Sequence, residues 1–307
     1  MSLDYAGLIA RDPVINGRRK RGHAGYVDDL KRLRDAHYRQ FLEGGEYRFA
    51  GVNEVIAAFD APPPEDFTFP YSLTPEQVAQ LARHRVQGKY VKRFGNIRRS
   101  WALLLQYLPE LMAKNARSRE VLELSTAHGA TLEILRHKGH QVRGNDFPNF
   151  ISRKNPHDSR ERGVNEFVPG QHRDDHGFLN EKGEAQGWLY QPIIESLGLD
   201  VDLFDAGQVP YPYEAKRFDT VISFDALEHY CHPSDWLFII DEMVRIARRS
   251  VLVVTNPVQE HKLADPAYME AFHTFQKDMR DYRDGGFECV FAGMYRHQLT
   301  VFKLMAS

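Results

Sequence analysis

The chain has 307 residues, of which 42% are hydrophobic and 27% are charged, close to average globular usage. This composition excludes a wholly disordered chain, and no run approaches the ~18 apolar residues of a membrane-spanning helix. A formal net charge of −2 disfavours a generic nucleic-acid or membrane-surface binder, which is usually more basic. Cys231 and Cys289 are too few for a disulfide framework, and the N-terminus lacks the features of a secretory signal. We therefore expect a reduced, soluble, cytoplasmic protein.

The first 118 residues are predicted to form a helical region that differs in texture from the rest. A helical stretch is expected near 26–43, and the three prolines at 62–64 indicate a turn or linker. A second helical stretch begins at Thr74, a suitable N-cap that is followed by Pro75 and by Gln77, which completes a capping box. From there to Ala116, apolar residues recur at three- and four-residue steps, as in an amphipathic helix.

From residue 119 onward, short apolar runs alternate with amphipathic stretches. The runs are 121–124, 141–144, 201–204, 220–224 and 250–255, and the helix-like segments between them are 130–138, 189–197 and 234–248. This alternation predicts crossover βαβ units and a parallel sheet. Two further strand-like runs, 287–291 and 298–304, have no helix between them, so we expect them to pair antiparallel at an edge of the sheet. The polar stretch 151–188 is interpreted as an insertion between the second and third strands.

One strand-to-helix turn has the features of a nucleotide-binding site. Residues 123–130 read E-L-S-T-A-H-G-A, and Asp146 ends the next strand about twenty residues later. Unpaired N–H groups at a helix N-terminus bind such ligands, small residues let the ligand approach the backbone, and a carboxylate accepts hydrogen bonds from ribose hydroxyls. Because the turn keeps one glycine of a G-x-G-x-x-G set, an ordinary strand–helix turn is the alternative.

The order of several motifs resembles the class I S-adenosylmethionine (SAM)-dependent methyltransferases, in particular the group that acts on small molecules. The matching segments are 121–124 followed by Gly129, Asp146 at the ribose acid, D-A-G-Q-V-P-Y at 205–211, F-D-T-V-I-S at 218–223, A-L-E-H-Y at 226–230 and E-M-V-R-I-A-R at 242–248. The resemblance implies a Rossmann-like, doubly wound α/β fold. Its mostly parallel sheet has seven strands, and the last strand is antiparallel. The methyltransferase domain would be 119–307.

The resemblance also assigns roles in binding SAM. Glu123 would support the methionine end of the cofactor, Gly129 would pack close to it, and Asp146 would hold the ribose. Asp205 and Ala206 would meet the adenine edge, and Phe224 would approach the sulfonium.

Two residues of the first motif depart from the family pattern. Ser125 and Ala127 stand where the family usually has glycine. We include both among the cofactor-binding residues, and a non-catalytic methyltransferase-like binding protein is the alternative.

Histidine and acidic residues after the fourth core strand are the candidates for chemistry. His229, paired with Glu228, is the predicted general base, since histidine is the side chain best suited to accept a proton near neutral pH. The alternative is that this pair braces the following helix. Asp225, Glu228 and His229 also carry groups that can bind a metal ion. Because the same spacing occurs in members of the family that bind no metal, we predict no metal site. His172 and His176 in the insertion are interpreted as part of a solvated loop.

The N-terminal region and the insertion lie outside the shared core, so we expect them to determine acceptor specificity, with 1–118 covering the acceptor site. Basic residues between positions 83 and 99 are expected either to bind an anionic acceptor or to form a solvated helix face. We predict O-methylation of a small polar acceptor of sugar or secondary-metabolite type, with N-methylation of a small amine as the rival. The expected partner is a small molecule, with neither nucleic acid nor membrane. The sequence is compatible with a homo-oligomer.

Overall fold

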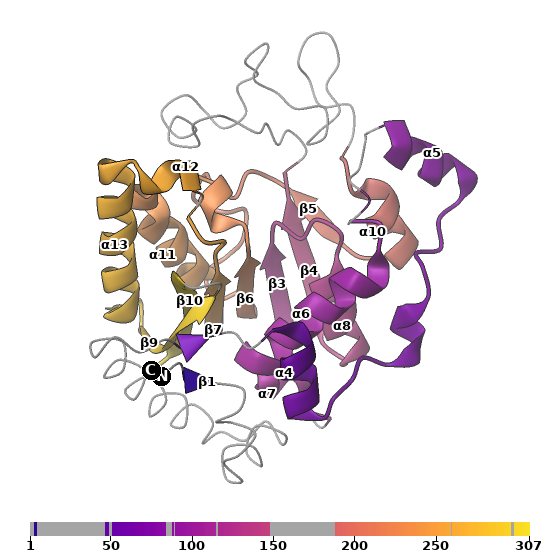
Figure 1. Cartoon of the computed structure of the whole chain (residues 1–307), viewed down its shortest axis with the longest axis horizontal. Coiled ribbons are helices and arrows are strands. Elements are labelled where there is room, and N and C mark those ends of the chain that lie inside the picture. The colour runs from indigo at the N-terminus through magenta and orange to yellow at the C-terminus, as the bar shows by residue number, and fades with distance from the viewer. Residues whose placement is uncertain are drawn as a thin grey trace.

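The computed structural model describes residues 3–4, 47–48, 51–83, 88, 90–114, 116–147, 188–258, 260–295 and 298–307. Strands gather in one central sheet, with helices packed around it (Figure 1). The predicted helix near 26–43, the insertion up to residue 187 and the pair His172 and His176 lie outside the described residues. The fold is therefore described for the methyltransferase-like core and for the N-terminal segments that pack on it.

Five parallel strands form the core of the sheet. They are β3 (Glu120–Leu124), β4 (Gln141–Asp146), β5 (Val201–Leu203), β6 (Phe218–Phe224) and β7 (Ala247–Val254). Their order in space is β5-β4-β3-β6-β7, so the chain winds outward from β3 in one direction and then from β6 in the other. The doubly wound parallel sheet predicted from the sequence is confirmed. Ligands of such sheets bind at the carboxyl ends of the strands beside this switch point.

A C-terminal hairpin extends the sheet beyond β7. Its strands are β9 (Phe287–Tyr295) and β10 (Gln298–Ala306), and β10 pairs antiparallel with both β7 and β9. The antiparallel last strand is thus confirmed, but the expectation that this hairpin is the edge of the sheet is wrong. Two-residue strands β1 (Leu3–Asp4) and β2 (Tyr47–Arg48) continue the sheet past β9, and β8 (Arg283–Asp284) also pairs with β9. Strands of this length carry no periodic pattern, so the sequence did not predict them.

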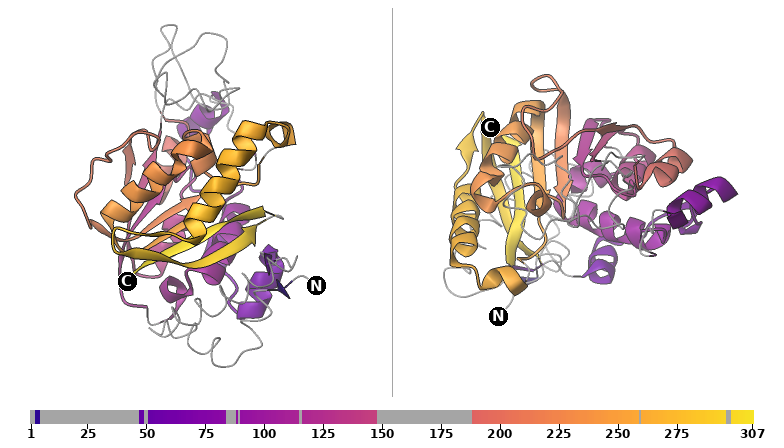
Figure 2. Two further views of the ribbon diagram at one scale, coloured as in Figure 1. Left: turned by 90° about the vertical axis from the view of Figure 1, so that its left-hand side faces the viewer. Right: turned by 90° about the horizontal axis from the view of Figure 1, so that it is seen from above.

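Helices connect and flank the strands. In the core they are α8 (Ala130–His137), α10 (Gln191–Leu197), α11 (Trp236–Ile246), α12 (Glu260–Leu263) and α13 (Pro266–Arg280), together with the short 3₁₀ turns η2 (Leu227–His229) and η3 (Pro233–Asp235). Figure 2 shows α11 and α13 beside the strands that come last in the chain, and the two helices contact each other. No helix in the described ranges has the length and apolar character needed to cross a membrane.

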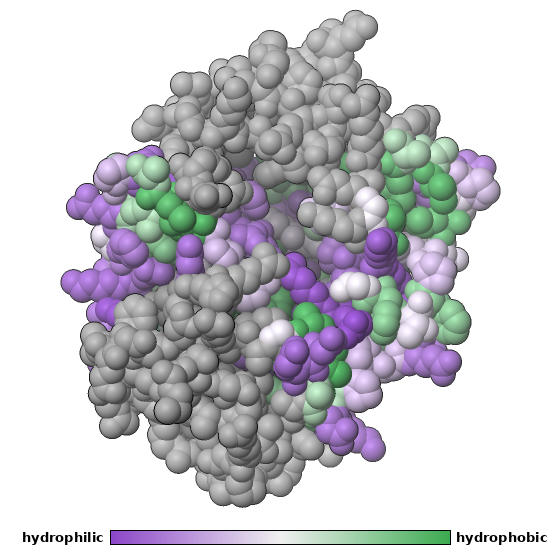
Figure 3. Space-filling view, viewed as in Figure 1, coloured by the Kyte–Doolittle hydropathy of each residue, from purple (hydrophilic) through white to green (hydrophobic). Residues whose placement is uncertain are grey.

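The N-terminal region contributes α4 (Val52–Phe59), η1 (Glu65–Thr68), α5 (Pro75–Arg83), α6 (Arg93–Tyr107) and α7 (Pro109–Met112). The predicted capping box of α5 is confirmed: the Thr74 amide donates to Gln77 Oε1 at 2.9 Å and the Gln77 amide donates to Thr74 Oγ1 at 3.2 Å. Leu81 is buried against Tyr71, whereas Val78 is 52% exposed. Apolar side chains accordingly show on the surface over α5 (Figure 3).

Helix α6 belongs to the same hydrophobic core as the sheet. Trp101 and Leu104 of α6 lie in one buried cluster with Val121 of β3, and α6 packs against α8. The following turn is tied to β10, because the buried Lys303 Nζ donates to the Tyr107 carbonyl at 2.8 Å and pairs with Glu110 at 2.7 Å. The helical segment before β3 is therefore built into the fold.

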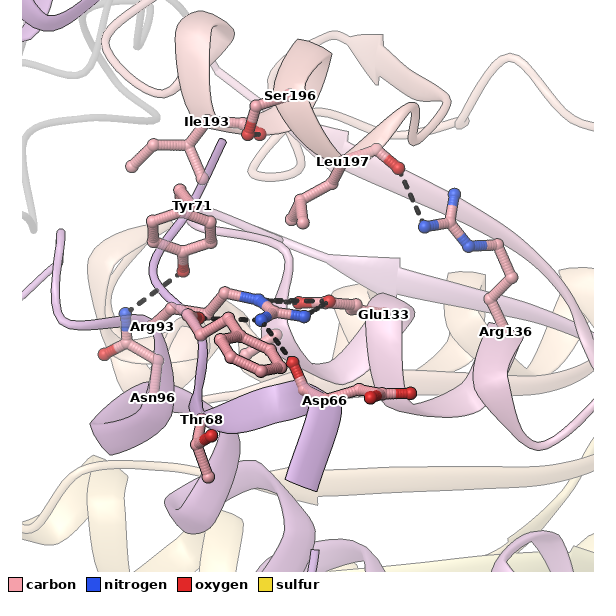
Figure 4. Close-up of polar contacts among 12 residues, drawn as sticks. Asp66, Thr68, Tyr71, Arg93, Asn96, Glu133, Arg136, Ile193, Ser196 and Leu197 are labelled. Carbon is pink, nitrogen blue, oxygen red and sulfur yellow. Dashed lines mark hydrogen bonds and ion pairs between the residues drawn. The ribbon is translucent and has the colours of Figure 1, made fainter. Parts of the chain in front are cut away.

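A buried ion pair fixes the N-terminal region to α8 (Figure 4). Arg93, at the start of α6, places its guanidinium against the Glu133 carboxylate, with Nε 3.1 and 3.2 Å from the two carboxylate oxygens. The other end of the guanidinium donates to the carbonyls of Asp66 and Phe69 at 2.9 and 2.8 Å. One arginine thus connects the η1 segment, α6 and α8, and its side chain is 11% exposed.

Removing one partner of this ion pair should destabilise the fold. We expect Arg93→Met to lower the free energy of unfolding by about 3 kcal/mol, because it leaves the Glu133 carboxylate buried without its cation. The double variant Arg93→Met/Glu133→Gln should recover part of that loss. Urea unfolding followed by circular dichroism measures both.

The matched control is Arg136→Met, an arginine on α8, the helix that carries Glu133. The guanidinium of Arg136 donates only to the Leu197 and Gly198 carbonyls at the surface, so its loss should cost about 1 kcal/mol or less. Equal losses for the two arginines would contradict the assignment.

Candidate active site

The turn between β3 and α8 has left-handed backbone at alternate positions. Ser125 has φ +56°, Ala127 has φ +49° and Gly129 has φ +76°. A Cβ at Gly129 would lie 2.7 Å from Leu199 Cδ1 and 2.8 Å from Ile194 Cδ1, so these side chains would have to shift, and the left-handed φ itself favours glycine there. Ser125 and Ala127 therefore adopt a glycine-like backbone although each carries a Cβ, which costs about 1–2 kcal/mol per residue.

Hydrogen bonds to neighbouring strands hold this turn. The Ser125 hydroxyl lies 2.6 Å from the hydroxyl of the buried Tyr230, which follows η2. The Thr126 amide donates to the Asn145 carbonyl at 2.8 Å, and the Ala127 amide donates to Asp146 Oδ2 at 3.2 Å. The turn is thus bound on one side to the end of β4 and on the other to the segment after β6.

Glu123 lies beneath the turn, with a side chain that is 5% exposed overall. Burial raises its pKa to about 8, against the lowering effect of the Thr131 and Thr126 hydroxyls. Its Oε2 atom is buried and has no hydrogen-bond partner. Ionising Glu123 would therefore bury a negative charge that lacks a compensating cation.

Asp146 ends β4 beside Glu123. Its Oδ1 accepts from the Phe147 amide at 2.8 Å, and its Oδ2 accepts from the Ala127 amide and from Trp188 Nε1, the latter at 3.0 Å. Burial raises the pKa of Asp146 to about 6, and these three donors oppose the rise. Trp188 is 5% exposed and was missed by the sequence reasoning, because it comes directly after a long polar segment with no pattern of its own.

Aromatic rings border the site beside Asp146. The centroids of Trp188 and Tyr190 lie 6.3 Å apart, those of Tyr190 and Tyr90 5.6 Å apart, and those of Tyr90 and His128 6.1 Å apart. Burial, followed by the charge of Arg99, lowers the pKa of His128 to about 4, so this imidazole is neutral at pH 7. The rings add an apolar border to one side of a site that is otherwise rich in polar groups.

The connection after β5 brings the predicted adenine-side residues to the same edge. The Phe204 amide donates to the Asp146 carbonyl at 3.0 Å, which places Asp205 and Ala206 beside the end of β4. Asp205 Oδ1 accepts from the Gly207 amide at 2.8 Å, and the buried Ala206 accepts from the Tyr211 hydroxyl through its carbonyl at 2.8 Å.

Phe224, half-buried, ends β6 on the other side of the switch point. The structure therefore brings all eight predicted cofactor-binding residues to one edge of the sheet, while their contacts with the cofactor remain predictions.

Glu228 and His229 lie in η2, just after β6. Glu228 Oε1 accepts from the backbone and side-chain nitrogens of Asn256, at 3.2 and 2.5 Å, and is 3.7 Å from His229 Nε2. The His229 side chain is 43% exposed. Glu228 thus braces the segment after β7 and lies next to the exposed imidazole of His229. In the part of the chain that the structure describes, no group of three or more acidic, histidine or cysteine side chains is placed to hold a metal ion.

The described arginines of α6 point to different partners and do not form a single patch. Arg93 pairs with Glu133, Arg98 donates to Asn53, and Arg99 pairs with Asp225 directly after β6. Arg99 also donates to the Tyr295 hydroxyl at 3.1 Å. Of these three arginines, Arg99 is the one that reaches the carboxyl edge of the sheet.

A doubly wound sheet with a left-handed turn and two desolvated acids at its switch point defines an α/β protein that binds a nucleotide-like cofactor. The family described as "Methyltransferase domain" matches residues 93–278, more than half of the chain, and the chain belongs to this family. The protein is a SAM-dependent methyltransferase, as the sequence predicted. The matched region begins at Arg93, so it includes α6.

Solved structures of methyltransferases are similar to the chain at low sequence identity. Magnesium protoporphyrin IX methyltransferase from Synechocystis, with bound SAM, is 16% identical, covers 76% of this chain and 92% of its own, and has a TM-score of 0.37. The 1,6-didemethyltoxoflavin-N1-methyltransferase of Burkholderia thailandensis, with bound 1,6-didemethyltoxoflavin and S-adenosylhomocysteine, is 14% identical, covers 81% and 93%, and has a TM-score of 0.36. No curated protein sequence matches the chain significantly.

Releasing the strain in the turn should stabilise the protein. We expect Ala127→Gly to raise the free energy of unfolding by about 0.5–1 kcal/mol. The strain that a Cβ causes in the left-handed conformation costs more than the extra backbone entropy that a glycine loses on folding. Urea unfolding measures the change. Ala102→Gly, inside α6, is the matched control and should lose about 1 kcal/mol. A loss of stability in Ala127→Gly would show that the turn is not strained.

The raised pKa of Glu123 should make stability depend on pH. The pKa of Glu123 in the folded protein is about 8, above the ordinary value of 4.5. The protonated carboxyl therefore makes its full contribution to the free energy of unfolding below about pH 4.5, and this contribution is lost as the pH rises through 8. Glu123→Gln, which cannot ionise, should match the wild type near pH 4.5 and exceed it by up to roughly 4 kcal/mol at about pH 9. Denaturant titrations across this range measure the difference, and a difference that does not vary with pH would contradict the burial of an ionisable Glu123.

Proposed function

We propose that the protein transfers the methyl group of SAM to a hydroxyl group of a small polar acceptor. The observation that carries the cofactor part is the pair of neighbouring acids, buried Glu123 and half-buried Asp146, whose pKa values are raised to about 8 and about 6. SAM carries a sulfonium and an ammonium group, and a cation close to a buried carboxyl group favours its ionised form. The two acids therefore suit a cationic ligand, and the free Oε2 of Glu123 would gain a partner.

The residues of the turn would position the cofactor. Asp146 would accept hydrogen bonds from ribose hydroxyls, using lone pairs that its present donors leave available. Ser125 and Ala127 adopt the left-handed conformation that glycines usually adopt in such turns, and this conformation would let the cofactor approach the backbone. When bound, SAM supplies an electrophilic methyl group on a positively charged sulfur.

His229 would accept the proton that the acceptor hydroxyl loses. Its imidazole is exposed at the carboxyl end of β6, and Glu228 Oε1 lies 3.7 Å from Nε2. A proton taken up by the ring would be stabilised by this carboxylate, which Asn256 holds in place. This arrangement supports general-base catalysis and hence O-methylation over N-methylation, because a neutral amine attacks without prior loss of a proton.

Calorimetric titration with SAM and with S-adenosylhomocysteine tests the cofactor site directly. We expect micromolar binding by the wild type, and in Asp146→Asn a loss of roughly 1.5–3 kcal/mol, about 10- to 150-fold in affinity. Asp202→Asn is the matched control: Asp202 lies on β5 and contacts Arg143 and Tyr213, so affinity should stay within about twofold. Because Trp188 donates to Asp146, its intrinsic fluorescence gives a second readout.

Methyl transfer from radiolabelled SAM to a set of hydroxyl and amine compounds tests the base. His229→Ala should bind S-adenosylhomocysteine like the wild type and transfer methyl to hydroxyl compounds about 10²–10⁴ times more slowly. Full activity in this variant would reject His229 as the base, and transfer to amines alone would favour N-methylation. Absence of SAM binding by the wild type would reject the proposed function altogether.

A further inference from the structure

Three segments that are far apart in the chain meet beside His229. Arg99 reaches from α6 and pairs with Asp225, the residue directly after β6, and its Nη2 donates to the Tyr295 hydroxyl at 3.1 Å. Because β9 runs parallel to β6, its last residue, Tyr295, lies at the same carboxyl edge of the sheet. The Arg99 side chain is 38% exposed and that of Asp225 is 13% exposed.

Asp225 is held in an unfavourable conformation at this place. Its φ is +51°, in the left-handed region, while its amide donates to the Val254 carbonyl at 2.6 Å and its carbonyl accepts from Asn256 Nδ2 at 3.5 Å. Three of the five non-glycine residues with positive φ in the described ranges, Ser125, Ala127 and Asp225, lie at this edge of the sheet. Backbone strain of this kind concentrates at ligand-binding sites.

The ion pair leaves one donor and one acceptor unused. Asp225 Oδ1 and Arg99 Nε are both buried, and neither has a hydrogen-bond partner. Glu228 Oε2, three residues further along the chain, is in the same state. Buried polar atoms without partners are rare in folded proteins, and each one calls for an explanation, such as a bound water, ion or ligand. Three of them lie close together along this one segment and its ion pair, which favours a ligand here.

We propose that Arg99 and Asp225 form the acceptor subsite and that they bind a hydroxyl group of the acceptor. This inference rests on the proposed function and names the chemical group that the same site takes. A hydroxyl donates one hydrogen bond and accepts others, so it satisfies the Asp225 carboxylate and the Arg99 guanidinium together. The two side chains carry opposite charges, so the pair as a whole favours a neutral group over a carboxylate or an ammonium.

Ligand-observed NMR on the protein saturated with S-adenosylhomocysteine tests the subsite without knowledge of the natural acceptor. The probes are phenol, toluene and aniline, which share a ring and differ in carrying a hydroxyl, a methyl or an amine group. We expect phenol to bind the wild-type complex about tenfold more tightly than toluene, since toluene forms no hydrogen bonds with the pair. Arg99→Met and Asp225→Asn should each bind phenol only about as well as toluene, with affinity for S-adenosylhomocysteine retained.

Arg98→Met is the matched control, because Arg98 is the neighbour of Arg99 on α6 and donates to Asn53 instead. It should keep the preference for phenol. Equal binding of phenol and toluene by the wild type, no binding of phenol, or a preference that survives in Arg99→Met would overturn the proposal. Tighter binding of aniline than of phenol would overturn the hydroxyl assignment. Failure of the wild type to bind S-adenosylhomocysteine is a separate result, since it rejects the proposed function on which the subsite rests.

Discussion

The left-handed turn between β3 and α8 is the constraint on which the rest of the site depends. Its conformation aims the Ala127 amide at Asp146 and places Ser125 against Tyr230, so it orders the ends of β4 and of the β6 segment together. Desolvation raises the pKa of the two acids beside it, buried Glu123 and half-buried Asp146. The protein thus retains backbone strain, and carboxyl groups that are costly to ionise, at the place where a cationic cofactor would favour their ionised forms.

The N-terminal region completes this site as well as the core. Arg93 connects η1 and α6 to α8 through a buried ion pair, and Lys303 connects the end of α6 to β10. These two fixed points determine where Arg99 emerges from α6. In the proposed subsite, Arg99, which precedes the first core strand, would meet Asp225 from the end of β6, so residues outside the cofactor turn would determine acceptor recognition.

Local patterns predicted most of the fold. Apolar runs separated by amphipathic stretches located the five parallel strands and the helices between them to within a few residues, and the Thr74 capping box was identified from four residues. Site residues that depend on long-range packing were not accessible in this way. Ser125 meets Tyr230 across 105 positions, and Asp146 meets Trp188 across 42. No local pattern links such pairs, because the sheet order and the register of neighbouring strands bring them together.

Ser125 and Ala127 also bear on how such proteins are recognised across evolution. Glycines are one way to form a left-handed turn. Here the turn amides of Thr126 and Ala127 donate to Asn145 and Asp146, and the Ser125 hydroxyl bonds with that of Tyr230, so the left-handed backbone is held with side chains present. Searches that require the glycines would pass over chains of this kind. In this chain the shape of the turn is kept by its hydrogen-bond partners rather than by glycine at each left-handed position.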